Sequence, residues 1–171
     1  MYIFNLNPMK VVLCCLVFFT LWSCSEKQAY YTMEDFGKVE KIDTHIHVST
    51  NSDAFVEQAN KDNFRLLNIV VDLSRGRKFV EDEYAFRLDQ KTRHPKSFEM
   101  ATAFSIKEWD DPNWLDNTLA WLQKNIDDGA LAVKVWKNVG MVFRDSTGQL
   151  VMVDNPKLDT IFKFLTERKI P

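Results

Sequence analysis

Beyond residue 40, short apolar runs alternate along the chain with segments of helical periodicity. The sequence predicts strands at residues 41–48, 64–73, 97–104 and 131–136, and helices at 53–62, 77–93, 111–129 and from Asn155-Pro156 onward. Such alternation is typical of a parallel sheet covered by helices. Right-handed crossovers leave two arrangements, an open doubly wound sheet and a (β/α)8 barrel.

The turn after the first predicted strand distinguishes these two arrangements. A dinucleotide-binding sheet has a Gly-rich turn at this point. Here residues 47–53, HVSTNSD, contain no glycine. We therefore expect an α/β fold in which residues 41–171 form the first four βα units of a (β/α)8 TIM barrel. A small hairpin around Asp145–Gly148 would be inserted after the fourth strand.

The charge balance bears on the kind of partner. The chain has 22 Lys and Arg against 24 Asp and Glu, and 46% of its residues are hydrophobic. Nucleic-acid binding relies on a basic surface, which this composition does not supply. We therefore expect a globular domain that acts on a small-molecule substrate, with no nucleic-acid partner.

The amino-terminal segment has the composition of an export signal. Lys10 precedes the apolar run Val11–Trp22, which is too short to cross a bilayer, since a spanning helix needs about 20 residues. Leu21-Trp22-Ser23-Cys24 resembles a bacterial lipobox, in which the Cys is lipidated. This predicts a lipoprotein signal peptide at 1–23, lipidation of Cys24, a tether at 24–40 and a lipid-anchored protein of the bacterial cell envelope. The alternative is an ordinary secretory signal with a chance Cys.

Cysteine usage limits how a metal could be bound. All three cysteines, Cys14, Cys15 and Cys24, lie in this amino-terminal segment. Residues 25–171 therefore have no thiol for a zinc cluster or a disulfide. Any metal there must be bound by His, carboxylate or modified Lys.

The segment KIDTHIHVS, residues 41–49, has two histidines one residue apart in an apolar run. Side chains alternate across a strand, so we expect Asp43, His45 and His47 on one buried face, pointing into the barrel. Two imidazoles about 7 Å apart along a strand can converge on one ion. They also lie near the carboxyl end of the strand, where barrel active sites are built. The alternative is a pair of hydrogen-bonded core histidines.

This Asp-x-His-x-His motif, together with GALAVKVWKN at 129–138, resembles the amidohydrolase superfamily of metal-dependent (β/α)8 hydrolases, in particular its amidohydrolase-2 branch. The resemblance implies that His45 and His47 are metal ligands. It also implies that Lys134, on the fourth strand, is a catalytic residue and a ligand that can bridge two metals as a carbamate. The cofactor would be one or two divalent ions, with zinc as the leading candidate.

A separate physical argument concerns Lys134. If Val133 and Val135 face the helices, Lys134 points into the barrel, where a buried ammonium beside a cation is doubly unfavourable. Reaction with CO2 would turn it into an anionic ligand. The alternative is an unmodified Lys134 that contacts the substrate.

Other residues receive smaller roles. Asp43 would orient a ligand histidine from behind, as hydrogen-bonded carboxylates often do. Lys137 and Asn138, on the following loop, are candidates for substrate contact. Asp72 would make a structural hydrogen bond, and His94 would be a solvated loop residue on the opposite end of the barrel.

The resemblance implies a hydrolase that attacks a C–N, C–O or lactone bond with water activated by the metal. A nonoxidative decarboxylase of the same branch and a non-catalytic lipoprotein binding module are the alternatives. The superfamily completes its site with ligands on later strands, and a full barrel needs about 250 residues. We therefore expect this chain to be an amino-terminal half, inactive alone, that requires the missing carboxyl-terminal half to close the barrel.

Overall fold

A computed structural model of the protein describes residues 30–171. The predictions for residues 1–29, including the signal peptide and Cys24, lie outside these residues. Met33–Pro171 form one compact unit, which opens with a single 3-10 turn, η1 (Met33–Asp35). Within residues 30–171, no helix combines the length and the apolar character needed to cross a membrane.

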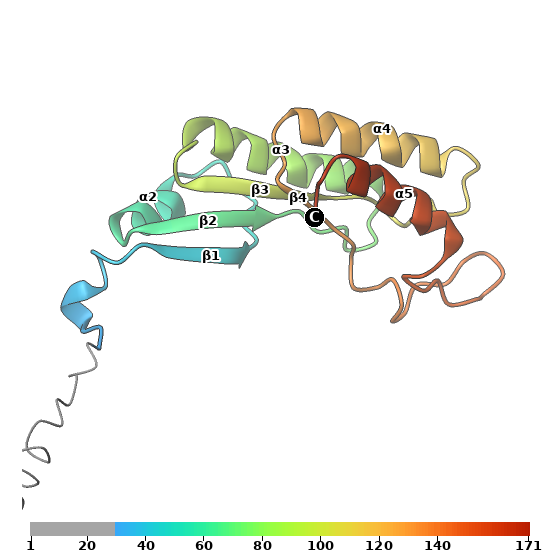
Figure 1. Ribbon diagram of the computed structural model, residues 1–171. Coiled ribbons are helices and arrows are strands. Elements are labelled where there is room, and N and C mark those ends of the chain that lie inside the picture. The colour runs from blue at the N-terminus through green and yellow to red at the C-terminus, as the bar shows by residue number, and fades with distance from the viewer. Residues whose placement is uncertain (1–29) are drawn as a thin grey trace, which may run out of the picture. The chain divides into compact units, whose positions relative to one another are not determined.

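The strands form one parallel sheet whose order follows the sequence (Figure 1). They are β1 (Lys41–Ile46), β2 (Phe64–Ile69), β3 (Phe98–Ala103) and β4 (Ala132–Lys134). The four predicted strands are therefore confirmed, although each ends earlier than predicted. A doubly wound sheet would reverse its strand order, so the order β1-β2-β3-β4 is that of a half-barrel.

Three helices connect successive strands and a fourth follows the last strand, all on one side of the sheet (Figure 1). They are α2 (Ala54–Lys61), α3 (Arg77–Arg93), α4 (Trp114–Asp127) and α5 (Pro156–Glu167). Crossovers of one hand between strands in sequential order place every helix on the same face. We call the helix-covered side the outer face and the other side the inner face; among the described residues, no helix covers the inner face.

The apolar core fills the space between the sheet and these helices. Phe98 and Leu66 pack against Val56 of α2, and Met100 packs near Tyr84 of α3. The largest cluster lies under α4 and α5, where Leu122, Leu158 and Ile161 are fully buried. The sheet is thus held from one side by apolar contact.

Helix starts follow local hydrogen bonding. The Asn155 side chain accepts a hydrogen bond from the Lys157 N–H at 2.9 Å, and Pro156 occupies the first turn, as predicted. The helix predicted from residue 111 begins later, at Trp114. Asp111 precedes it and accepts from the Asn113 N–H at 2.7 Å.

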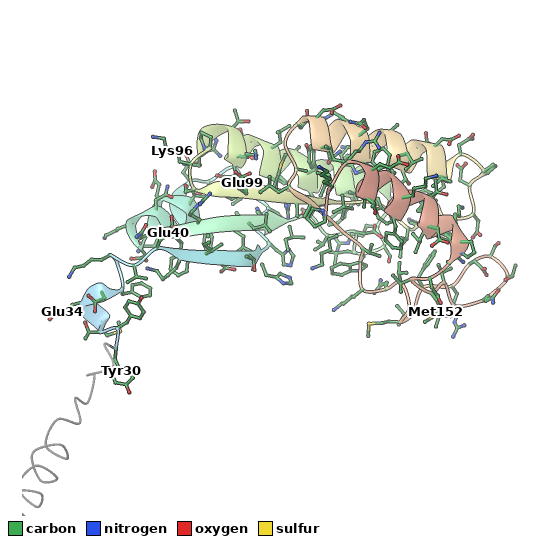
Figure 2. All side chains as sticks on the ribbon, viewed as in Figure 1. Tyr30, Glu34, Glu40, Lys96, Glu99 and Met152 are labelled. Atoms are coloured by element: carbon green, nitrogen blue, oxygen red, sulfur yellow. The ribbon has the colours of Figure 1, made fainter. Side chains whose placement is uncertain are left out.

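The two ends of the sheet differ in what surrounds them. Glu40 and Lys96 precede β1 and β3, and they mark the amino ends of the strands in Figure 2. Met152 lies toward the opposite end, in the segment between β4 and α5. That segment contains the predicted small hairpin, in which Arg144 pairs with Leu150 in antiparallel fashion. The carboxyl ends of the strands therefore face the longer connections.

Candidate metal centre

The three predicted ligands meet at the carboxyl ends of β1 and β4. The Nε2 atoms of His45 and His47 lie 3.1 Å apart, with their rings inclined at 87°. The Nζ atom of Lys134 lies 3.3 Å from Nε2 of His45. Three nitrogen donors separated by up to 89 positions in the sequence thus form one cluster.

This cluster exists because the sheet is curved. β1 and β4 are the two outermost strands, with β2 and β3 between them. In a flat sheet, three strand spacings would separate their backbones by about 14 Å. The 3.3 Å contact between Lys134 and His45 therefore requires the sheet to curl toward its inner face. That curvature is what a barrel sheet has.

The hydrogen bond at the back of His47 determines which nitrogen faces the cluster. Nδ1 of His47 lies 2.9 Å from the carbonyl oxygen of Ile69, the last residue of β2. A carbonyl oxygen can only accept, so Nδ1 carries the proton. When the ring is neutral, Nε2 then has the lone pair, directed at His45, and this is the form that binds metals.

The spacing of the two imidazoles suits a shared ion. Two nitrogens each about 2.0–2.1 Å from one tetrahedral zinc are about 3.4 Å apart. The observed 3.1 Å requires only a small adjustment of the rings. No group of three His, Cys, Asp or Glu side chains gathers within residues 30–171, so Lys134 is the third side chain at this point. An ammonium has no lone pair, and Lys134 would have to lose its proton or be carbamylated to bind a metal.

The expectation that the two histidines are buried is wrong. Both side chains are exposed, whereas Ile46 between them is buried under α2. The reason is that the inner face has no helix over it among the described residues. The cluster is therefore accessible to small molecules and ions from the inner face.

Asp43 does not share the face of the histidines, contrary to the prediction. Asp43 pairs with Leu66 and Ile46 pairs with Asn68, so β1 has one extra residue between these pairs. Such a bulge reverses the alternation of side chains along the strand. Asp43 therefore lies on the outer face, and its carboxylate accepts a hydrogen bond from the backbone N–H of His45 at 3.0 Å. No bond from Asp43 to an imidazole ring is present in the described structure.

The two candidates for substrate contact differ in their surroundings. Lys137 is exposed, with its Nζ 5.6 Å from the centre of the Trp136 ring, and Lys134 lies 5.7 Å from the same ring. Trp136 thus lies between a cluster residue and Lys137. The Asn138 amide instead donates to the hydroxyl of Ser74 at 2.9 Å, which ties the loop after β4 to the loop after β2.

Asp72 and His94 have partners that sequence reasoning described only in part. Asp72 is fully buried, and its Oδ2 accepts from the backbone N–H of Ile106 at 3.2 Å, while its Oδ1 has no hydrogen-bond partner among residues 30–171. Burial raises the pKa of this carboxyl group above its ordinary value. His94 is not solvated, because its side chain is only 18% exposed and its Nε2 lies 2.8 Å from a carboxylate oxygen of Asp53. It makes no contact with the histidine pair.

Sequence reasoning missed the polar side chains that hold the loop after β1. The buried residues of α3 are Val80, Tyr84, Arg87 and Gln90, so the second half of its buried face is polar. These four residues recur at helical spacing in the sequence. An Arg and a Gln on the same helix face as two apolar residues could have indicated a buried polar contact. Gln90 donates to the carbonyl oxygens of Thr50 and Ser52.

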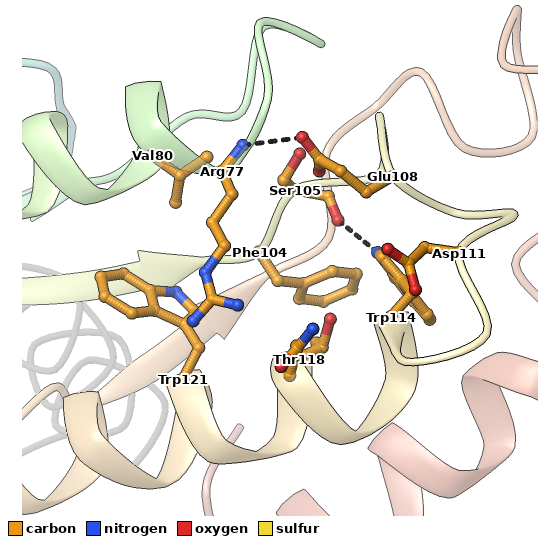
Figure 3. A pocket seen from close by; sticks show the side chains of 10 residues that line it. Arg77, Val80, Phe104, Ser105, Glu108, Asp111, Trp114, Thr118 and Trp121 are labelled. Atoms are coloured by element: carbon orange, nitrogen blue, oxygen red, sulfur yellow. Dashed lines mark hydrogen bonds between the residues drawn. The ribbon is translucent and has the colours of Figure 1, made fainter.

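A separate cavity of about 210 Å³ lies between α3 and α4 (Figure 3). Phe104, Trp114 and Trp121 line it, and the Arg77 side chain extends among them (Figure 3). The backbone N–H of Arg77 donates to Glu108 at 3.1 Å at its edge. This cavity is on the outer face of the sheet, so it is not part of the histidine cluster.

Comparison with protein-family models, curated proteins and solved structures found no match for this chain. The class of the protein therefore follows from the fold and the cluster alone: an α/β chain with a parallel half-barrel sheet.

Proposed function

We propose that His45, His47 and Lys134 bind a divalent metal, zinc being the best candidate, and that the centre serves a hydrolase acting on a C–N, C–O or lactone bond. The observation that carries the proposal is the 3.1 Å separation of the two Nε2 atoms, with Lys134 3.3 Å from His45, on an accessible curved face. Its position at the carboxyl ends of parallel strands supports it further.

Each residue has a distinct part in this proposal. In its neutral form, His47 presents an unprotonated Nε2, because its Nδ1–H donates to Ile69. His45 lies between His47 and Lys134 and has Nε2 contacts with both. Lys134 either binds the metal as a carbamate, formed when its amine adds to CO2 and releases a proton, or contacts the substrate as a free amine. The ion itself would supply Lewis acidity toward water and a carbonyl group.

The substrate side of the centre is aromatic and basic. Trp136 provides a flat apolar surface, and Lys137 provides a cation at its edge. We propose that these residues favour a small substrate with an anionic group. The electrostatic attraction would bring such a substrate to the inner face beside the metal ligands.

The chain contains three histidines, which gives the test a matched control. His45→Ala and His47→Ala each remove one donor, and His94→Ala removes the histidine paired with Asp53. We expect zinc content after dialysis, measured by elemental analysis, to fall strongly in the first two variants and to match the parent in the third. Zinc-dependent hydrolysis of a panel of lactones, esters and amides, assayed with a carboxyl-terminal half that completes the barrel, should follow the same order.

Full zinc content in a His45→Ala/His47→Ala double variant would contradict the metal centre. Zinc loss in all three single variants would show a general effect of histidine removal on folding. Zinc binding at His45 and His47 without hydrolysis of any substrate class by the completed barrel would retain the centre and reject the hydrolase.

A further inference from the structure

The most unusual buried group near the cluster is the guanidinium of Arg87. This side chain of α3 is completely buried. Removing a charge from water costs several kcal/mol unless close partners compensate for it. Desolvation accordingly lowers the pKa of Arg87, against the opposing effect of the Glu83 carboxylate. A leucine would fill this space without that cost, so the polar contacts of Arg87 need an explanation.

Those contacts converge on the segment that carries His47. Nη1 of Arg87 donates to Oε2 and the backbone oxygen of Glu83, both at 2.7 Å, and to the hydroxyl of Ser49 at 3.2 Å. Ser49 in turn donates to Oε2 of Glu83 at 2.6 Å. Nη2 of Arg87 donates to the carbonyl oxygen of Ile69 at 3.3 Å. Ser49 lies two residues after His47.

The Ile69 carbonyl oxygen is the same atom that accepts from Nδ1 of His47, at 2.9 Å. A carbonyl oxygen has two lone pairs, so it can accept both donors at once. Arg87 approaches it from α3 and His47 approaches it from β1. The peptide group that carries this carbonyl is held by the Val70 N–H, which donates to Ala101 at 2.9 Å, and by the buried guanidinium on its oxygen. The orientation of the His47 ring depends on this oxygen.

The backbone next to His47 is held by a second, independent contact. The Asn68 side chain accepts from the N–H of Val48 at 3.0 Å and donates to its carbonyl oxygen at 2.8 Å. Asn68 thus fixes the position of the backbone beside His47, and Ile69 separately fixes the orientation of the His47 ring. Loss of Arg87 removes the bonds to the Ile69 carbonyl and to Ser49 and leaves both Asn68 contacts in place.

We propose that Arg87 is a positioning residue for His47, acting through the Ile69 carbonyl oxygen to hold the imidazole in the tautomer that directs Nε2 at the metal centre. The part of this inference that concerns zinc rests on the proposed function. The part that concerns the tautomer applies to the metal-free chain. Hydrogen-bonded partners behind a ligand histidine typically change metal affinity 10- to 100-fold.

The helix itself offers a matched control. Gln90 lies on the same face of α3, is also completely buried and also holds the loop after β1, through Thr50 and Ser52. It makes no hydrogen bond to Ile69 in the described structure. Gln90→Met therefore loosens the loop in a similar way to Arg87→Met and leaves the Ile69 carbonyl with its partners.

The test measures two properties of the 171-residue chain. Long-range ¹H–¹⁵N spectra of the zinc-free protein report the tautomer of each histidine, and competition with a chromophoric chelator reports zinc affinity. We expect Arg87→Met to mix the tautomers of His47 and to weaken zinc binding about 10- to 100-fold. Gln90→Met should change neither. Arg87→Lys, which keeps a cation beside Glu83, should recover part of both properties and serves as the informative variant if Arg87→Met does not fold.

Two results would overturn the inference. One is a folded Arg87→Met or Arg87→Lys variant with the parent's tautomer and zinc affinity. The other is an equal loss in Gln90→Met, which would show that any anchor of the loop has the same effect. If His45→Ala and His47→Ala leave zinc binding intact, the proposed function fails. The tautomer of His47, compared between the parent and the Arg87 variants, then still tests the role of Arg87.

Discussion

His47 shows how much a single hydrogen bond determines at this centre. Its sequence neighbourhood predicts a strand histidine near a carboxyl end, and the structure places it directly after the last residue of β1. Its tautomer depends on the Ile69 carbonyl 22 positions away, which no local pattern reveals. Asp43 fails as a predicted partner for a similar reason, because the bulge in β1 is a property of its pairing with β2.

Two aspartates should change stability with pH in opposite directions. Burial raises the pKa of Asp72, so the folded chain binds this proton more tightly than the unfolded chain. Its contribution to stability is present at low pH and is lost as the pH rises through the folded pKa. We expect Asp72→Asn to gain unfolding free energy relative to the parent as the pH rises from the acid range to neutral.

Asp128 supplies the opposite case. A hydrogen bond from Lys124 lowers its pKa most, and the Tyr84 hydroxyl adds to this effect. Its contribution is present at neutral pH and is lost as the pH falls through the folded pKa. Asp128→Asn should therefore be less stable than the parent at neutral pH, with the gap closing in acid. Urea titrations from acid to neutral pH measure the unfolding free energy of each variant relative to the parent. If this difference changed with pH in the same direction for Asp72→Asn and Asp128→Asn, the opposite pKa shifts of the two aspartates would be refuted.

The strands and helices could largely be predicted because each is an apolar run or a helical repeat bounded by polar residues. Their ends could not, as the end of β2 illustrates. Val70 and Val71 are buried and continue the apolar run, yet the strand stops at Ile69. The chain then turns through Leu73 and Ser74, both at positive φ, near 51° and 54°. Tertiary contacts set this turn, and no Gly or Pro marks it.

β1 is an edge strand that exposes an apolar side chain on the inner face. Ile42 is 64% exposed. An open edge can pair with another chain, and Lys at such an edge opposes that pairing. We expect concentration-dependent self-association of the chain, reduced by Ile42→Lys, in sedimentation velocity. Phe55→Lys, at an exposed position on α2 and not on a strand, is the control and should associate like the parent. A parent that stays monomeric at all concentrations would contradict this.

The convergence of β1 and β4 follows from the curvature of the sheet, whereas the placement of the helices follows from the sequential strand order and the hand of the crossovers. The sequence predicts the order through its βα alternation. The curvature of the sheet is harder to predict from the sequence, because it depends on how the packed helices tilt successive strands. The contact between Lys134 and His45 is its most sensitive reporter.

The envelope location predicted from the amino-terminal segment has its own test. Cys24 ends the apolar run and follows Leu21-Trp22-Ser23. In a bacterial host, Cys24→Ala should abolish labelling by a fatty-acid analogue and move the protein out of the membrane fraction. Cys15→Ala, in the interior of the same run, should leave both unchanged. Labelling that persists in Cys24→Ala would reject the lipid anchor.

Zinc-edge X-ray absorption of the zinc-loaded chain would test the centre most directly, because it identifies the atoms bound to the metal. The account predicts imidazole scattering from two histidines at about 2.0–2.1 Å, with the pattern unchanged in His94→Ala. One imidazole should disappear in His45→Ala or in His47→Ala. A spectrum without imidazole ligands, or one that changes with His94 and not with His45 or His47, would contradict the account.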